Sequence, residues 1–418
     1  MMEESAVLRM KVFKSGPGPI RLAAYLSTLT LILTGCGGIL NSAGNPSTTT
    51  YAHHPSPPTA QVRAIEAARN TPAPVSPVSF YLDGPTWSEA TQPKLVIFHD
   101  VPQILTINGN QALIWRRGHG QWYRRILLSI PAGKTVDSTA LACDSRHCYA
   151  AIAYTQSNSS DHVAILRLTN AAWKSVGKMA IPNAAAIGEI ALAPDGSGVW
   201  LLATGQPALG LMAKQLWVSQ DTGQQWTLLA TSDISRVSAR LSFPPGYPTG
   251  LVALTPQRVI VSNSSRGNRD STAIEYQANP PQATNLGFPI PARFSFVDEA
   301  FPALKGHALT IPVVAIRAQS AQLLWETRRS GTHWQTRLGP SLSPNPSITG
   351  HDTLVVVNLK TLQILSPHQP AIRAPLSSKF VNPVVATVIG RSRVVVLATH
   401  GDLWENTGTG NWRLYHGE

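Results

Sequence analysis

Short apolar runs, each ended by a turn rich in Gly, Asp or Ser, recur along the chain from about residue 78 onward. In the last unit four such runs follow one another, at Val384–Ile389, Val394–Thr399, Leu403–Asn406 and Asn411–Tyr415. Apolar runs of this length between turn residues are typical of antiparallel β-strands. We therefore predict a sheet of four short strands here, and residues 189–229 repeat the pattern.

Tryptophans make the period of this repeat visible. They form four pairs, in which the first member follows Ile or Leu and the two members bracket a Gly-containing turn: Trp115/Trp122, Trp217/Trp226, Trp325/Trp334 and Trp404/Trp412. We predict that Trp173 and Tyr276 close two further units and that a weaker unit lies around residues 354–366. A repeat of about fifty residues with four strands indicates a β-propeller blade, because one small sheet cannot bury both faces without neighbours.

The chain is therefore predicted to be all-β, with a β-propeller of four-stranded antiparallel blades over residues 78–418. Seven blades fit the spacing, with six or eight as alternatives. A signal peptide over residues 1–35 and a flexible linker over residues 36–77 come first. The linker is rich in Pro, Ser and Thr, a composition that cannot bury a core.

Composition agrees with short strands and turns. Charged residues make up 13% of the chain, and it contains 31 Gly and 33 Pro. The net charge of +12 could attract anionic membrane headgroups or acidic cell-wall polymers. For the basic cluster of Arg116–Arg117 and Arg124–Arg125 the sequence favours a solvated edge that discourages strand pairing over a polyanion site. We expect a monomer without a nucleic-acid partner.

The N-terminus predicts an export signal. A basic segment with Arg9 and Arg21 is followed by the apolar run Leu22–Leu33, which is short for a membrane-spanning helix. Leu33-Thr34-Gly35-Cys36 resembles the lipobox of bacterial lipoproteins. The resemblance implies cleavage before Cys36 and a diacylglycerol on its sulfur. An ordinary cleavage site and an uncleaved anchor are the alternatives, and translation starts at Met1 or Met10.

The lipid on Cys36 would place the chain on the extracytoplasmic face of a bacterial membrane, and the sequence leaves open which membrane. In such an oxidising compartment Cys143 and Cys148, which flank a short turn, are expected to form a disulfide. Two buried thiols are the alternative. A single Cys pair is too sparse for zinc, so we predict no metal and no cofactor.

Residues Ser219 to Trp226 spell S-x-D-x-G-x-x-W, with Asp221 and Gly223 at the inner positions. Asp221 is expected to accept hydrogen bonds from the turn's own N–H groups, and Gly223 to adopt a positive φ. The series resembles the Asp-box, or bacterial neuraminidase repeat, of sialidases and of the photosystem II assembly factor family. The resemblance implies a structural turn on the propeller rim, away from the ligand face. In the copy that ends at Trp334, Arg329 stands at the Asp position.

The same resemblance raises the question of sialidase activity. Sialidases require three arginines, a Tyr/Glu nucleophile pair, an acid/base Asp and usually an (F/Y)-R-I-P sequence, which this chain lacks. Pro289–Phe294 holds similar ingredients in another order. No catalytic residue is assigned, and we predict a binding or assembly scaffold for a protein or glycan. A divergent extracellular glycoside hydrolase is the alternative. The candidate ligand loops are Thr155–Asp161, Gly205–Ala213, Ala278–Pro289 and Pro340–Pro346.

Overall fold

The structure is a computed structural model. It describes residues 72–73, 93–118, 121–132, 134–156, 160–169, 172–181, 186–208, 211–232, 239–244, 246–264, 273–287, 290–294, 296–305, 308–317, 320–328, 333–342, 347–349, 354–357, 361–365, 372–375, 383–389, 393–398, 403–406 and 412–415. The predicted signal peptide and Cys36 lie outside these residues.

The described strands form seven sheets, which we call A to G in chain order. Sheet A contains β2 (Lys94–Phe98), β3 (Val101–Asn108), β4 (Gln111–Gly118) and β5 (Gln121–Ser129), with β1 (Pro72–Ala73) on the edge of β5. Sheet B contains β6 (Val136–Cys143), β7 (Cys148–Gln156), β8 (Ser160–Thr169) and β9 (Ala172–Ile181). Sheet C contains β10 (Ala186–Leu192), β11 (Val199–Ala208), β12 (Leu211–Ser219), β13 (Thr227–Thr231) and the short parallel β14 (Leu241–Ser242).

Four sheets follow in the second half of the described chain. Sheet D contains β15 (Tyr247–Thr255), β16 (Arg258–Ser264), β17 (Ala273–Gln277) and β18 (Gln282–Asn285). Sheet E contains β19 (Phe296–Ala300), β21 (Ala308–Arg317), β22 (Ser320–Arg328) and β23 (Gln335–Leu342), and β20 (Ala303–Lys305) also pairs with β21. Sheet F contains β24 (Ser347–Thr349), β25 (Leu354–Val357), β26 (Thr361–Leu365) and β27 (Ile372–Pro375). Sheet G contains β28 (Pro383–Ile389), β29 (Arg393–Ala398), β30 (Leu403–Asn406) and β31 (Trp412–Leu414).

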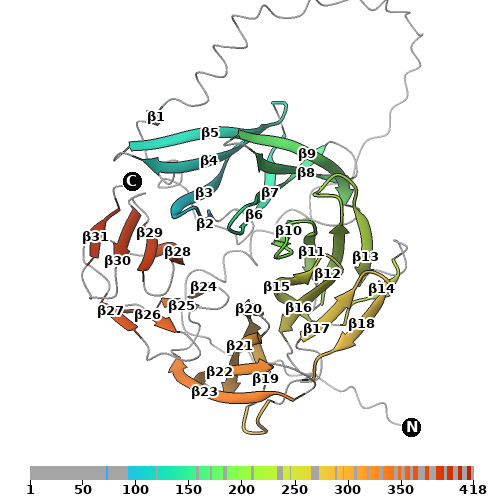
Figure 1. Ribbon diagram of the computed structural model, residues 1–418, viewed down its shortest axis with the longest axis vertical. Coiled ribbons are helices and arrows are strands. Elements are labelled where there is room, and N and C mark those ends of the chain that lie inside the picture. The colour runs from blue at the N-terminus through green and yellow to red at the C-terminus, as the bar shows by residue number, and fades with distance from the viewer. Residues whose placement is uncertain are drawn as a thin grey trace, which may run out of the picture. The chain divides into compact units, whose positions relative to one another are not determined.

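The sheets succeed one another around a common centre, with β20 of sheet E and the first strands of the other sheets nearest to it (Figure 1). Sheets A and G, which lie at opposite ends of the described chain, meet where β2 contacts β28. Across the same junction Tyr415 Oη donates a hydrogen bond to Asp100 O at 3.4 Å. The fold is therefore an all-β propeller of four-stranded antiparallel blades, as predicted.

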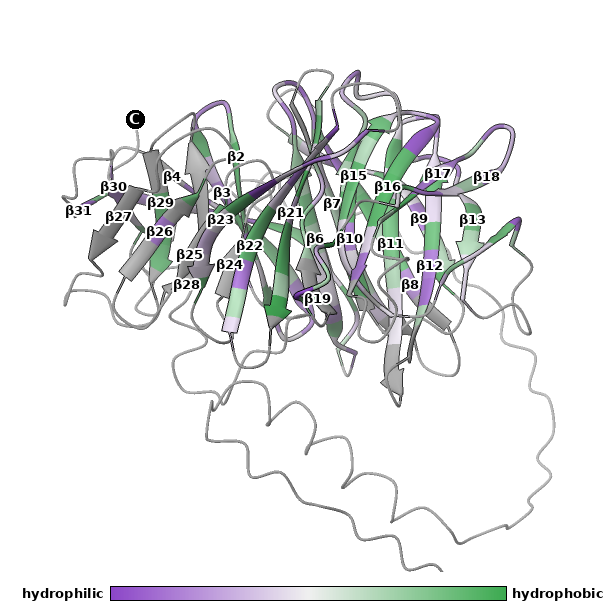
Figure 2. Ribbon diagram, turned by 90° about the horizontal axis from the view of Figure 1, so that it is seen from below, coloured by the Kyte–Doolittle hydropathy of each residue, from purple (hydrophilic) through white to green (hydrophobic). Residues whose placement is uncertain are grey.

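Hydrophobic clusters fill the spaces between consecutive sheets. On β11, Val199 and Leu201 pack in the cluster shared with sheet B, whereas Trp200 and Leu202 pack in the cluster shared with sheet D. Alternate residues of a strand point to opposite faces, so a strand buried on both faces is apolar throughout. This explains the continuous apolar runs of the sequence, which follow strands such as β21 in Figure 2.

Connections within the sheets lie at two ends of the strands. Because consecutive strands are antiparallel, the turns between first and second strands and between third and fourth strands lie at one end, which we call the turn end. The turns between second and third strands and the crossovers to the next sheet lie at the other end, the crossover end.

The predicted strands of the last unit agree with β28 to β31 to within about one residue. Two details differ from prediction. Tyr276 lies in β17, the third strand of sheet D, and the closing strand β18 begins at Gln282 without an aromatic residue. Within the predicted linker, β1 pairs with β5, where Pro72 lies opposite Tyr123.

Candidate functional site

The turn from Ser219 to Trp226 joins β12 and β13 at the turn end, and Asp221 organises it. Oδ1 of Asp221 accepts hydrogen bonds from Ser219 Oγ at 2.7 Å, Gln224 N at 3.1 Å and Gln225 N at 2.9 Å. Burial alone would raise the pKa of Asp221, but the hydrogen bonds from Gln225, Ser219 and Gln224 outweigh it and hold the pKa below its ordinary value. The carboxylate therefore stays ionised and fixes the turn.

Gly223 carries the conformation that closes this turn. Its φ of 95° lies in the left-handed region that favours glycine. Its N–H donates to Ser219 Oγ at 2.8 Å, and its carbonyl accepts from Trp226 Nε1 at 2.9 Å. Ser219, the first residue of the S-x-D-x-G-x-x-W pattern, is thus hydrogen-bonded to both Asp221 and Gly223. Trp226, the last residue of the pattern, is hydrogen-bonded to Gly223.

The same turn packs against the preceding sheet. Tyr149 Oη of β7 donates to Thr222 O at 3.3 Å, and Val176 and Ile165 surround Gly223. Gly177 of β9 is so close that a Cβ atom there would lie 2.1 Å from Gly223 O. The Ser219–Trp226 turn is therefore a joint between sheets B and C.

Further turns at this end interlock in the same way. His99 Nε2, in the β2–β3 turn, forms a hydrogen bond of 2.9 Å with Ser145 O in the β6–β7 turn. His147 of that turn lies against Gly196 in the β10–β11 turn, and Gly198 lies against Pro256 in the β15–β16 turn. The first turns of sheets A to D thus support one another in series.

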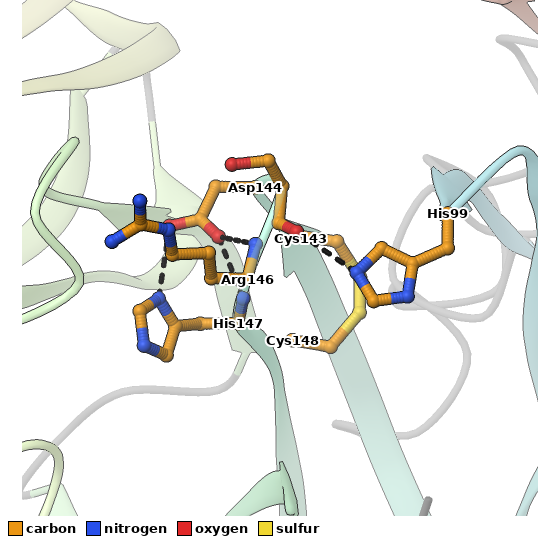
Figure 3. The surroundings of a disulfide bond; sticks show 7 residues. His99, Cys143, Asp144, Arg146, His147 and Cys148 are labelled. Carbon is orange, nitrogen blue, oxygen red and sulfur yellow. Dashed lines mark hydrogen bonds and ion pairs between the residues drawn. A yellow bond between two sulfur atoms is a disulfide. The ribbon is translucent and has the colours of Figure 1, made fainter.

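The β6–β7 turn is closed by a disulfide between Cys143 and Cys148, as the sequence predicts (Figure 3). The two Cα atoms are 4.1 Å apart, at the ends of adjacent strands. Inside the turn Asp144 accepts from Arg146 N and His147 N, each at 2.6 Å. Among the described residues no group of three or more His, Cys, Asp and Glu side chains could hold a metal ion.

Three charged side chains of the described residues are buried and were not singled out in the sequence: Lys214, Glu326 and Glu405, of which Glu405 is paired with Arg413. Lys214 of β12 is 1% exposed, and its Nζ donates to Pro244 O at 2.7 Å and Gly246 O at 2.8 Å. Burial lowers the pKa of Lys214 to about 8. The residue ties the crossover between sheets C and D to the third strand of sheet C. Its place two residues before the core residue Leu216 is the signal that could have found it.

Glu326 of β22 is the second buried charge. It is fully buried, and its Oε2 accepts a hydrogen bond from Thr336 Oγ1 at 2.8 Å. Its Oε1 has no hydrogen-bond partner among the described residues. Burial raises the pKa of Glu326 to about 7, although the bond from Thr336 opposes this shift.

The paired tryptophans bracket the turn between the third and fourth strands in alternate sheets, A, C, E and G. Trp115, Trp217, Trp325 and Trp404 lie on the third strands, and Trp122, Trp226, Trp334 and Trp412 lie at or just before the fourth strands. Trp115 is fully buried, and its Nε1 donates to Thr106 Oγ1 at 2.8 Å. Trp334 Nε1 donates to Leu286 O, which links the final hairpin of sheet E to the preceding crossover.

The predicted ligand loops divide between the two ends. Thr155–Asp161 and Gly205–Ala213 span the adjoining ends of second and third strands and therefore belong to the crossover end. Most of their residues belong to the strands themselves, and residues 157–159 and 209–210 lie outside the described residues. Ala278–Pro289 contains the β17–β18 turn, which belongs to the turn end, together with β18 itself. The predicted loop is therefore not a single loop. It contains the fourth strand of sheet D, which is shorter and more polar than the apolar runs by which the sequence identifies strands. Pro340–Pro346 begins inside β23, and its residues 343–346 lie outside the described residues.

No protein-family model matches the chain, and no curated protein matches its sequence. Among solved structures, the extracellular domain of BT4673 from B. thetaiotaomicron is similar over 79% of this chain, at 10% identity and a TM-score of 0.41. The chain spans 39% of the length of that protein. YCF48 bound to D1 peptide matches 76% of this chain and 94% of its own, at 10% identity and a TM-score of 0.40.

SapL1 lectin in complex with alpha methyl fucoside matches 69% of this chain and 98% of its own, at 12% identity and a TM-score of 0.41. Identities and TM-scores this low say nothing about what this chain binds. The described residues contain no helix of the length and apolarity needed to cross a membrane.

Proposed function

We propose that this chain is a lipid-anchored extracytoplasmic scaffold, whose propeller binds a protein or glycan. The Cys143–Cys148 disulfide is the observation that best supports the location, because disulfides persist in oxidising compartments. The sequence Leu33-Thr34-Gly35-Cys36 supplies the attachment point. The turn from Ser219 to Trp226 acts in this scaffold as an Asp-box, with a structural role.

The ligand face lies at the crossover end in this proposal. At the turn end the side chains of His99, Tyr149 and His147 are engaged with neighbouring turns, so this end holds the ring together. Loops of a rigid propeller that do not serve this purpose are the ones available for a ligand. Thr155–Asp161 and Gly205–Ala213 are the first loops to test.

All seven sheets act as blades of one ring in this proposal. Sheet F carries the shortest strands, but Leu354 and Leu365 pack in one cluster with Leu323 and Trp325 of sheet E. Amide hydrogen exchange tests this assignment. Exchange in β25 and β26 should be as slow as in β29 and β30 of sheet G, and fast exchange confined to sheet F would leave a ring of six blades.

Two experiments test the anchor. Intact mass of the full chain should show a cleaved N-terminus and a diacylglyceryl group on Cys36, and the Cys36→Ser chain should lose the adduct and leave the membrane fraction. An unmodified Cys36 in a membrane-bound chain would contradict the lipid anchor. For the ligand face, blockwise replacement of residues 157–159 and 209–210 by Gly and Ser should abolish binding of the physiological ligand while leaving the unfolding midpoint unchanged.

A further inference from the structure

The outer parts of sheets A and B carry a concentration of positive charge. Strands β4, β5 and β9 contain six Lys or Arg residues and no Asp or Glu: Arg116, Arg117, Arg124, Arg125, Lys174 and Lys178. Arg116, Arg124, Lys174 and Lys178 are exposed, and Arg125 is half-buried. The two sheets are adjacent in the ring, with β5 and β9 both on its outer side (Figure 1).

Strand register places three of these cations on facing sides of the two sheets. Ile114 packs in the core between sheets A and B, and Arg116 lies two residues further along β4, on the same side. Arg125 is the cross-strand partner of Ile114 and shares that side. Across the gap Lys178 is the partner of Ala164, which packs in the same core. We call Arg116, Arg125 and Lys178 the basic seam.

Aromatic rings position two of the seam cations. The guanidinium of Arg116 lies 5.5 Å from the ring centroid of Tyr123, and Lys178 Nζ lies 5.7 Å from that of Tyr154. Such cation–π contacts direct a cation without neutralising its charge. None of the three forms an ion pair with a carboxylate in the described part of the chain, whereas Arg258 and Arg413 on other sheets do.

The tether joins the ring beside the seam. Strand β1 pairs with β5, and Pro72 lies opposite Tyr123, two residues from Arg125. Pro72 follows Cys36 by 36 residues, and a chain of that length with the flexibility that its composition predicts would span about 33 Å. A lipid on Cys36 would thus hold this edge of the propeller at a high effective concentration near the headgroups.

We propose that the basic seam docks the propeller onto anionic lipid headgroups of the membrane to which Cys36 is anchored. The proposal rests on the proposed lipid anchor, which by itself does not set the orientation of the propeller. Docking on the seam sets the orientation of the propeller. One lipid chain plus a basic patch is also a stronger membrane attachment than one lipid chain.

The test uses the full chain with Cys36→Ser, so that its outcome does not depend on lipidation. Binding is measured by co-sedimentation with phosphatidylcholine vesicles that contain or lack phosphatidylglycerol, at low and high salt. The basic variant carries Arg116→Gln, Arg125→Gln and Lys178→Gln. The matched control removes three exposed arginines elsewhere, with Arg240→Gln, Arg293→Gln and Arg337→Gln.

We expect the unaltered seam to bind phosphatidylglycerol vesicles more tightly than neutral ones, with the preference lost at high salt. Each cation near an anionic surface contributes about 1 kcal/mol, so the basic variant should bind these vesicles at least tenfold more weakly and the control less than about twofold. Equal loss in both variants would show an effect of net charge and overturn the proposal. Absence of any lipid preference would also overturn it.

Two further measurements distinguish lipid docking from loss of the fold and from binding of an acidic macromolecule. Urea unfolding of both variants shows whether the propeller remains folded; a basic variant that unfolds is replaced by Lys178→Gln alone, which should still weaken vesicle binding severalfold. Polyglutamate serves as an acidic polymer without a membrane. Binding to polyglutamate through the seam, without binding to vesicles, would assign the surface to an acidic macromolecule and refute the membrane proposal.

Discussion

One added methyl group at Gly177 tests whether the Ser219–Trp226 turn joins sheets B and C. In Gly177→Ala the new Cβ would lie 2.1 Å from Gly223 O. Carbon and oxygen atoms attract at separations of about 3.5 Å and repel strongly well inside that distance. The obstacle is a backbone atom, so the turn and β9 must separate by roughly 1 Å.

The cost follows from what that separation disturbs. Gly223 packs on Val176, Ile165 and Tyr149, and Tyr149 Oη is bonded to Thr222 O. Overpacking at such a contact costs about 1–3 kcal/mol. Replacing Gly by Ala also lowers the conformational entropy of the unfolded chain, which raises the free energy of unfolding by about 0.4–1 kcal/mol. We expect a net loss of about 1–2 kcal/mol in the free energy of unfolding.

Urea unfolding followed by tryptophan fluorescence measures this loss. Gly188→Ala is the matched control, because its Cβ would lie 3.4 Å from the nearest heavy atoms and its backbone φ needs no glycine. We expect the control to stay within about 0.5 kcal/mol of the unaltered chain. Asp221→Ala, combined with Gly177→Ala in a double-mutant cycle, should show a coupling energy, because both changes act on one turn.

Equal urea midpoints for Gly177→Ala and Gly188→Ala would refute the interpretation that the Ser219–Trp226 turn joins sheets B and C. So would unchanged amide exchange in residues 219–226 of Gly177→Ala, because a displaced turn must lose part of its hydrogen bonding. Additive effects of Gly177→Ala and Asp221→Ala would show that the carboxylate stabilises only its own turn.

Three other changes probe the same framework. Asp221→Ala alone should cost about 1–2 kcal/mol through the turn amides that lose their acceptor, with Asp221→Asn in between; unchanged thermal stability would contradict this. Cys143→Ser with Cys148→Ser should cost about 2 kcal/mol by opening a small loop, and two reactive thiols in the unfolded, unreduced chain would disprove the bridge. Because the pKa of Glu326 rises from 4.5 to about 7 on folding, stability should fall as pH increases from about 4.5 to 7. Urea midpoints measured across this pH range follow the decrease in stability, and Glu326→Gln should reduce that decrease by up to about 3 kcal/mol. An unchanged decrease in the variant would show that other groups cause it.

Much of the propeller could be predicted because its signals are local. A strand such as β29 is a run of Val and Leu ended by turn residues, and β-propensity and turn chemistry act within a few residues. Sheet D shows the limit of this approach. All four residues of its fourth strand, β18, are exposed, so no hydrophobic pattern distinguishes the strand, and the prediction that Tyr276 closes this unit is wrong for that reason.

The candidate sites were less predictable, because their properties depend on neighbours distant in sequence. Lys214 belongs to a strand that the sequence identifies, but its partners Pro244 and Gly246 lie in the following crossover. The sequence shows that Arg125 and Lys178 are positively charged, but it does not show on which side of its sheet each residue lies. Which side of a strand looks toward which sheet is known only once the cross-strand register is known.

The sequence by itself determined most of the apolar strands, the repeat, the disulfide pair and the S-x-D-x-G-x-x-W turn, since each depends on residue types at short fixed spacings. The tertiary structure decided that this turn joins two sheets through Gly177 and that three cations face one seam between sheets A and B. The physical reason is that packing and electrostatics act through space. A glycine or an arginine acquires its role from the atoms that folding brings within a few ångströms of it.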